Sequence, residues 1–262
     1  SFLYEKTAAI AALFKSNSIR AVAYKGPVLT EAAYPDASLR EFDDIDFLVH
    51  PEDIKKAVIT LTQNSYKLAG RLTSRSITAG AAFHIDWRVH THDRSFTIDL
   101  HPTPMGFALQ PLSVTDAILK NSRALTLDRK QVPAPDATDL LILACMHGTK
   151  HLWTRINWLA DLYNLLAHSS GELNLSSLMI RARQLQAECI VRFGLGLCRR
   201  TIGLPDTFSE ELPSPDSTIS QLMSESLSMI ETGKHMTIPL RQMIRCHIQC
   251  LDSVALTMRY IT

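Results

Sequence analysis

Residues 44–50 read Asp-Ile-Asp-Phe-Leu-Val-His, and this stretch decides how the chain is interpreted. The alternation of a β-strand would place Asp44 and Asp46 on one face, while the apolar residues Ile45 and Phe47 face the core. Two neighbouring carboxylates repel each other, so they cost stability unless a cation lies between them. The pattern predicts a strand that binds a hard divalent cation together with substrate phosphates, and the alternative is a solvated strand end.

A second acidic strand is predicted further along the chain. The segments HIDWRVH at 84–90 and FTIDLH at 96–101 flank a polar turn, which is typical of a β-hairpin. Asp99 lies on the face opposite its apolar neighbours, so it would join the two carboxylates of the first strand. Three carboxylates on neighbouring strands can hold two divalent cations for in-line displacement at phosphorus. The alternative role of Asp99 is a structural ion pair with Arg88.

The length of the hairpin loop predicts its register. It would place Arg88 opposite Asp99 and Asp86 opposite His101. The charged face of this hairpin is interpreted as support that orients Asp99 rather than as a group that acts on substrate. Its members are His84, Asp86, Arg88 and His101.

The turn before the first acidic strand has the residues of a phosphate site. An apolar run at 21–24 predicts a short strand that ends at Lys25 and Gly26. Glycine lets a phosphate approach the backbone at the N-terminus of a following helix, and Lys25 adds a positive charge. The alternative is an ordinary turn with an exposed lysine. Arg40 is a candidate clamp for a triphosphate oxygen, although an ion pair with an acidic neighbour explains it nearly as well.

The second half of the chain has helical periodicity, and the two prolines of VPAPD at 132–136 mark the predicted boundary. We therefore expect an α+β domain over 1–133 and an all-helical domain over 134–262 that closes the active-site cleft. A spacing of three and four residues would place His147, Lys150 and His151 on one helix face. We interpret this face as a contact for the triphosphate.

Two features of the helical half leave alternatives open. HGTKH at 147–151 is superficially similar to a zinc motif, but Gly148 stands where a general-base glutamate is required, which argues against a metalloprotease. Asp161 falls within an apolar stripe, where an unpaired carboxylate would be costly. A structural pair with Lys150 or a histidine and a direct role at the substrate are weighed equally.

Composition limits the remaining classes of function. Hydrophobic residues make up 46% of the 262 residues, which excludes a disordered or fibrous chain. The 27 basic and 26 acidic residues give a net charge of +1, so no global field attracts nucleic acid or an anionic membrane. Five cysteines without metal-type spacing predict reduced thiols in a cytoplasmic protein. No apolar run is long enough for a membrane span, so we expect no membrane partner.

Taken in order, four segments resemble the uncharacterised nucleotidyltransferase family of the polymerase-beta-like superfamily. The resemblance covers roughly residues 20–168 and implies an α+β fold in which a small mixed sheet is flanked by helices. One departure is that Lys25-Gly26 replaces the Gly-Ser of the usual phosphate loop. The segments are YKGPVL at 24–29, YPDASLREFDDIDFLV at 34–49, FTIDLHPTP at 96–104 and LILACMHGTKHLWTRINWLADL at 141–162.

The resemblance implies an enzyme that uses Mg²⁺ or Mn²⁺ and moves a nucleoside monophosphate from a nucleoside triphosphate to an acceptor hydroxyl, releasing pyrophosphate. Asp44 and Asp46 would match the paired metal ligands, and Asp99 the third carboxylate. Lys25, Gly26 and Arg40 would hold the β- and γ-phosphates. A small molecule or a protein is favoured as acceptor. The alternatives are a toxin-like transferase that acts on RNA and a non-catalytic nucleotide-binding module on the same fold.

Overall fold

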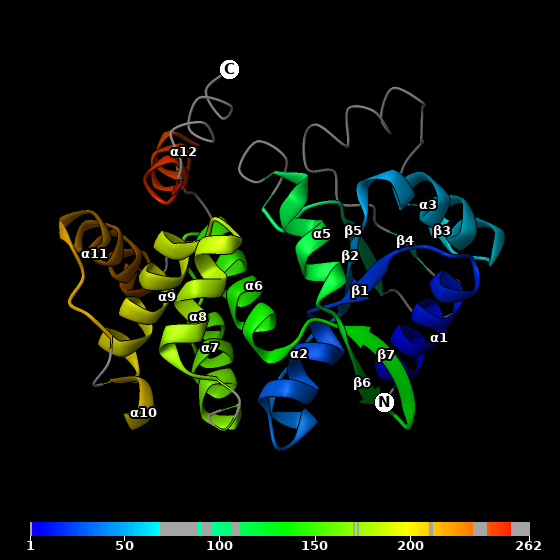
Figure 1. Cartoon of the computed structure of the whole chain (residues 1–262), viewed down its shortest axis with the longest axis horizontal. Coiled ribbons are helices and arrows are strands. Elements are labelled where there is room, and N and C mark those ends of the chain that lie inside the picture. The colour runs from blue at the N-terminus through cyan, green and yellow to red at the C-terminus, as the bar shows by residue number, and fades with distance from the viewer. Residues whose placement is uncertain are drawn as a thin grey trace. The chain divides into compact units, whose positions relative to one another are not determined.

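The computed structural model describes residues 2–68, 89–90, 96–105, 111–169, 171, 173–209, 212–232 and 240–252. The chain divides into two compact units, Ser1–Asp136 and Ala137–Thr262. Figure 1 gives the order of the elements along the chain. The two units are described separately below.

The first unit is built on a five-stranded mixed sheet. Its strand order is β1-β2-β5-β4-β3. The central pair, β2 and β5, is parallel, whereas β1 pairs with β2, β4 with β5 and β3 with β4 in the antiparallel sense. This arrangement confirms the predicted small mixed sheet. The strands are β1 (Ala21–Ala23), β2 (Asp44–Val49), β3 (Lys67–Leu68), β4 (Val89–His90) and β5 (Thr97–His101).

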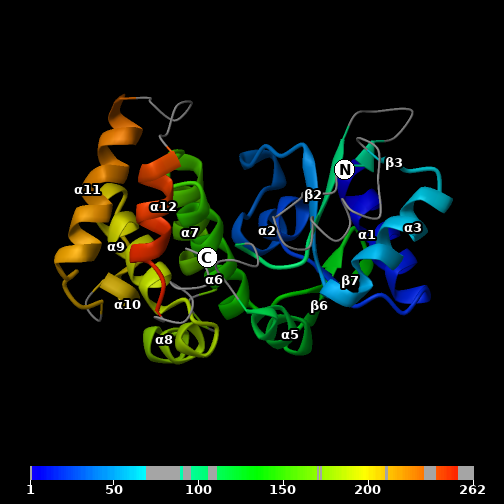
Figure 2. The ribbon, with the colours of Figure 1, turned by 90° about the horizontal axis from the view of Figure 1, so that it is seen from above.

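Helices flank this sheet. Phe14 of α1 packs edge-on against Phe47 of β2, with ring centroids 5.1 Å apart, and both side chains are buried. Figure 2 shows α1 and α3 side by side. These contacts fix β2 in the core and so position the acidic residues at its start. The helices are α1 (Phe2–Ser16), α2 (Gly26–Ala33), α3 (Ile54–Gln63) and α5 (Leu112–Lys120), with short 3-10 turns η1 (Ala37–Leu39) and η2 (Pro51–Asp53).

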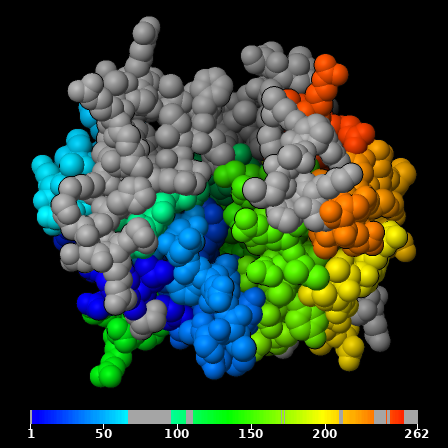
Figure 3. Space-filling view, turned by 180° about the vertical axis from the view of Figure 1, so that it is seen from behind, coloured from blue at the N-terminus to red at the C-terminus, as the bar shows by residue number. Residues whose placement is uncertain are grey.

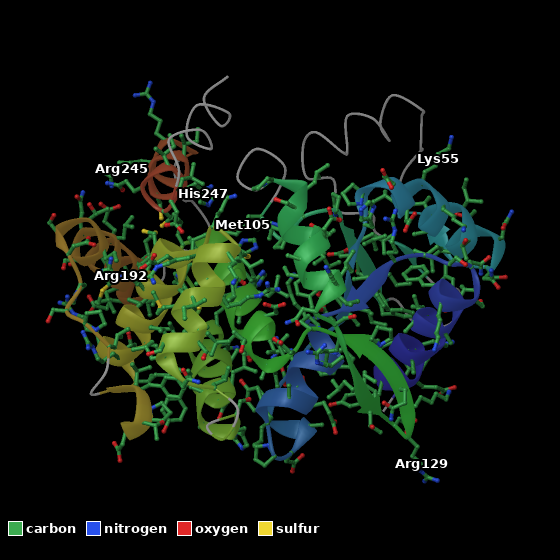
Figure 4. The ribbon with its side chains drawn as sticks, viewed as in Figure 1. Lys55, Met105, Arg129, Arg192, Arg245 and His247 are labelled. Atoms are coloured by element: carbon green, nitrogen blue, oxygen red, sulfur yellow. The ribbon has the colours of Figure 1, made fainter. Side chains whose placement is uncertain are left out.

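A second hairpin, formed by β6 (Arg123–Leu127) and β7 (Lys130–Ala134), was not predicted, and β7 includes the first residues of the predicted boundary at 132–136. Its two turn residues, Asp128 and Arg129, both have positive φ, at 47° and 64°. Two consecutive positive φ values are typical of a tight hairpin turn, which usually contains glycine or asparagine. The pair Asp-Arg lacks that signal, and the prolines nearby argued for a boundary instead. Figure 4 shows Arg129 at the tip of this hairpin.

The second unit is helical, as predicted. Figures 1 and 2 show α9 among its neighbours, and it packs against α6, α7, α8 and α11. Within the described parts of the chain, no helix has both the length and the apolar character needed to cross a membrane. The helices are α6 (Ala137–Lys150), α7 (Ile156–His168), α8 (Leu175–Gln184), α9 (Glu188–Thr201), α10 (Asp206–Ser209), α11 (Ser217–Thr232) and α12 (Leu240–Gln249).

Trp153 fills the core of this unit directly after α6. Its indole leaves no room for a side chain at Gly148 or Gly194, because an added Cβ would lie 2.5 Å and 2.8 Å from its ring atoms. The indole Nε1 donates a hydrogen bond to Thr149 Oγ1 at 3.2 Å. Gly148 of the HGTKH segment is therefore explained by packing, and the buried indole fixes the end of α6.

Candidate active site

The pairing of β2 with β5 brings two acidic residues together. Asp46 and Asp99 are direct partners in the parallel register, and their exposed fractions are 1% and 8%. His101 follows on the same face of β5 and is also buried. One ligand atom from each of these three residues lies within 4.8 Å of the others. The sheet thus forms a compact Asp-Asp-His group in which side chains from two strands can reach one cation.

A buried lysine lies against this group. Lys25 Nζ is 2.6 Å from Asp46 Oδ1, and His101 Nε2 is 2.8 Å from the same oxygen. Burial alone would raise the pKa of Asp46, but Lys25 and His101 outweigh burial and hold it far below its usual range. Burial likewise would lower the pKa of Lys25, and the attraction of Asp46 raises it instead. Asp46 and Lys25 are therefore both charged.

The second oxygen of Asp46 differs from the first. Oδ2 is buried and has no hydrogen-bond partner among the described residues. A buried carboxylate oxygen without a partner is costly unless a ligand or ion satisfies it. Oδ2 is consequently the atom of this group that could bind a cation or another ligand.

Asp44 has a different environment, although it lies only two residues from Asp46. Its side chain is partly exposed at the start of β2. Burial and the negative charge of Asp46 raise the pKa of Asp44 to about 6, and Lys25 only partly opposes this rise. The two acids of the Asp-X-Asp motif therefore ionise in different pH ranges.

Gly26 connects the phosphate loop to the acidic strand. Its φ is +47°, and a Cβ at this position would lie 2.7 Å from the backbone oxygen of Asp44. Only glycine fits this close approach without strain. The following helix offers fewer amide donors than the sequence indicated, because Pro27 has none and the Val28 amide donates to Lys25 O at 3.0 Å. Gly26 therefore serves backbone packing in addition to any phosphate contact.

The segment between α2 and β2 forms an open pocket of about 630 Å³ beside the start of the acidic strand. Arg40 is half-buried there, and its guanidinium carbon is 5.9 Å from the centre of the Phe42 ring. Figure 3 shows α2 and the residues after it at the surface of the first unit. This pocket has room for part of a nucleotide. Its lining consists of Leu3, Ala37, Arg40, Glu41, Phe42 and Asp43.

Comparison with known proteins gives the family of the chain. The model of the uncharacterised nucleotidyltransferase family matches residues 1–203. The chain belongs to that family. A crystal structure of an antigenic nucleotidyltransferase-like protein from Paracoccidioides brasiliensis is similar, with 9% sequence identity and a TM-score of 0.43, over 70% of this chain and 87% of that one. A search of curated proteins found no match.

The family match extends through α6, α7, α8 and α9, so it includes the three predicted triphosphate contacts of the helical unit. The rings of His147 and His151 lie 4.8 Å apart, and both contact the indole of Trp158 at 5.2 Å and 5.3 Å. Lys150 is partly exposed, and its carbonyl oxygen lies 3.1 Å from Nε2 of His247, which Figure 4 labels. The two histidines thus share one face, as their spacing predicted. Their role at a nucleotide remains a prediction.

Some predicted residues lie outside the described part of the chain, namely His84, Asp86 and Arg88. The observed pair Val89–Ile98 has the same register as the predicted pairing of Arg88 with Asp99. His101 was expected to orient Asp99, and the structure shows that its Nε2 also lies 2.8 Å from Asp46 Oδ1. The contact of Lys25 with Asp46 was not predicted, because Lys25 was interpreted only as a ligand for phosphate.

Proposed function

We propose that this member of the uncharacterised nucleotidyltransferase family transfers a nucleoside monophosphate from a nucleoside triphosphate to an acceptor hydroxyl of a small molecule or a protein. The observation that carries the proposal is the register of β2 and β5, which pairs Asp46 with Asp99 beside His101. Carboxylates on adjacent strands are what a metal-dependent phosphoryl-transfer site requires. Family membership makes this chemistry the first choice for such a group.

The donor set fits a divalent cation. Asp44, Asp46 and Asp99 supply carboxylate oxygens, which Mg²⁺ and Mn²⁺ both accept, and the buried Oδ2 of Asp46 has no hydrogen-bond partner among the described residues. When bound, such a cation would neutralise phosphate charge and favour the ionised form of the acceptor hydroxyl. We assign these three carboxylates as its ligands.

The protein groups have separate roles in the proposed reaction. Asp99 accepts the proton of the acceptor hydroxyl, whose oxygen forms a bond to the α-phosphorus. The bond between the α-phosphorus and its bridging oxygen breaks, and pyrophosphate leaves with the bonding electron pair. Lys25, Gly26 and Arg40 hold the β- and γ-phosphates. We further assign triphosphate contacts in the helical unit to His147, Lys150 and His151.

The test measures whether an acceptor takes up label from the triphosphate. Each nucleoside triphosphate, labelled at the α-phosphorus, is incubated with the protein, Mg²⁺ and a cell extract, and the extract is then separated into small molecules, proteins and RNA. We expect label in the small-molecule or protein fraction. Label at the γ-phosphorus should appear only in pyrophosphate, and Asp46→Asn should transfer none.

Each other outcome of this assay indicates a different class of function. Label in RNA alone would replace the proposed acceptor with the toxin-like one. Transfer from the γ position would indicate a kinase instead. Binding of triphosphate without transfer in any fraction, with a wild-type protein that is folded, would favour a non-catalytic nucleotide-binding module and contradict the proposal.

A further inference from the structure

Lys25 is aimed at an acid of the site rather than at open solvent. We propose that its ammonium is the counterion of Asp46 in the nucleotide-free protein and moves to the triphosphate when a nucleotide binds. The divalent cation would then enter together with the nucleotide and bind weakly without it. This inference rests on the proposed function, because it needs a metal and a triphosphate at the same site.

The geometry supports a counterion that can be exchanged. Lys25 Nζ is 2.6 Å from Asp46 Oδ1, and it lies 5.1 Å from the centre of the Tyr24 ring. The side chain of Lys25 remains 16% exposed, whereas that of Asp46 is 1% exposed. Lys25 therefore has a route to a ligand in solvent, and Asp46 is held in place inside the sheet.

The backbone explains why the lysine starts from this position. Gly26 has a positive φ and lies against the backbone oxygen of Asp44, so the residue before it is anchored beside the acidic strand. The Lys25 side chain has four flexible carbons, so its ammonium can reach different partners from a fixed Cα. The ammonium also has three N–H donors. A rigid contact would be less suited to such an exchange.

Electrostatics supply the coupling. A divalent cation bound to Asp46 would share the carboxylate with an ammonium that lies within hydrogen-bond distance of Oδ1. Like charges at this distance repel strongly in a partly buried site. A triphosphate removes the conflict because it attracts both cations, so nucleotide and metal should increase the affinity for each other. Lys25 is thus a positioning residue that makes metal entry depend on nucleotide.

The experiment measures Mn²⁺ binding by electron paramagnetic resonance, with and without a triphosphate whose α–β bridge cannot be cleaved. It uses the wild type, Lys25→Gln, which keeps a hydrogen-bond donor but has no charge, and Lys25→Arg, which keeps the charge. The matched control is Lys55→Gln, which removes an exposed charge on α3, labelled in Figure 4. Circular dichroism verifies that each variant is folded.

We expect Lys25→Gln to bind Mn²⁺ about tenfold more tightly than the wild type without nucleotide, equivalent to about 1.4 kcal/mol. The gain in Mn²⁺ affinity on adding nucleotide should shrink in this variant and persist in Lys25→Arg. Lys55→Gln should behave as the wild type. A purely structural lysine would predict unchanged or weaker Mn²⁺ binding in Lys25→Gln, and that result would overturn the inference.

A second readout needs no variant. If the wild type binds Mn²⁺ equally tightly with and without nucleotide, the inference is wrong. This test remains valid if Lys25→Gln does not fold. Mn²⁺ binding that depends on nucleotide but not on the charge at position 25 would reject the role of Lys25 and leave the proposed function standing. No Mn²⁺ binding under any condition would reject both.

Discussion

Each unit contains a buried aspartate with a basic partner, and the two differ in how completely they are bonded. In the helical unit, the two oxygens of Asp139 accept hydrogen bonds from Arg181 Nε and Nη2, each at 2.7 Å. In the sheet unit, Asp46 receives both of its contacts at Oδ1, while Oδ2 has no hydrogen-bond partner among the described residues. The first arrangement is complete as it stands. The second is complete only with a further ligand.

This difference separates a structural carboxylate from a candidate functional one. A buried charge is tolerated when its partner has good geometry and its remaining lone pairs are satisfied. Arg181 meets both conditions for Asp139 and ties α8 to α6. Lys25 neutralises the charge of Asp46 but bonds only one of its two oxygens, because an ammonium lacks the planar pair of N–H donors of a guanidinium. Burial alone would therefore not have distinguished the two aspartates.

The largest effect is expected from Asp46→Asn, which removes a proposed metal ligand while keeping the size of the side chain. Nucleotidyl transfer should fall by about 10⁴-fold or more, which corresponds to about 5.4 kcal/mol in the barrier. From the sequence alone, relief of carboxylate repulsion would have favoured a higher melting temperature. The ion pair reverses that expectation, because the variant removes the carboxylate that lies 2.6 Å from the mostly buried Lys25 ammonium. Assay of transfer and a thermal melt check both parts, and near-normal transfer would reject Asp46 as a ligand.

The next effect concerns stability in the helical unit. Arg181→Ala should lower the free energy of unfolding by about 3 to 5 kcal/mol, because it removes both guanidinium hydrogen bonds and the positive charge from the fully buried Asp139. The matched control is Arg183→Ala on the same helix, whose largely exposed pair with Glu188 is screened by solvent and should contribute far less. Denaturant unfolding of the two variants makes the comparison. Equal losses would show that burial does not set the strength of these pairs.

A smaller effect is expected from Lys150→Ala. If Lys150 contacts the triphosphate, nucleotide binding should weaken by about 1.5 to 3 kcal/mol while the fold is retained. If Lys150 is instead the partner of the buried Asp161, the protein should lose about 3 to 5 kcal/mol of stability, and a second change at Asp161 should restore part of it. Calorimetric titration with nucleotide and denaturant unfolding distinguish these outcomes.

The sequence was sufficient for the features that depend on local periodicity. Alternation placed Ile45 and Phe47 in the core of β2, and hairpin counting gave the register observed at Val89 and Ile98. It predicted that Asp99 would join the acids of the first strand, but not the direction or register of that strand pair. The parallel pairing of Asp46 with Asp99 and the bond from Lys25 depend on how separate segments pack, since 53 and 21 positions separate these residues. No periodic pattern encodes that packing.

The smallest effect distinguishes the two acids of the motif through pH. The pKa of Asp44 is raised to about 6, so the folded protein binds a proton more tightly than the unfolded chain. Stability should therefore fall as pH rises from about 4 to about 6, and Asp44→Asn should abolish this part of the fall. Above pH 6 the variant should be more stable than the wild type by about 1 to 2 kcal/mol, allowing for solvent screening of a partly exposed group. Denaturant unfolding across this pH range, with a chelator present, measures the difference. Asp43→Asn, at an exposed neighbouring acid, serves as the control. A stability difference that stays constant between pH 4 and pH 7 would show that burial and the charge of Asp46 do not raise the pKa of Asp44.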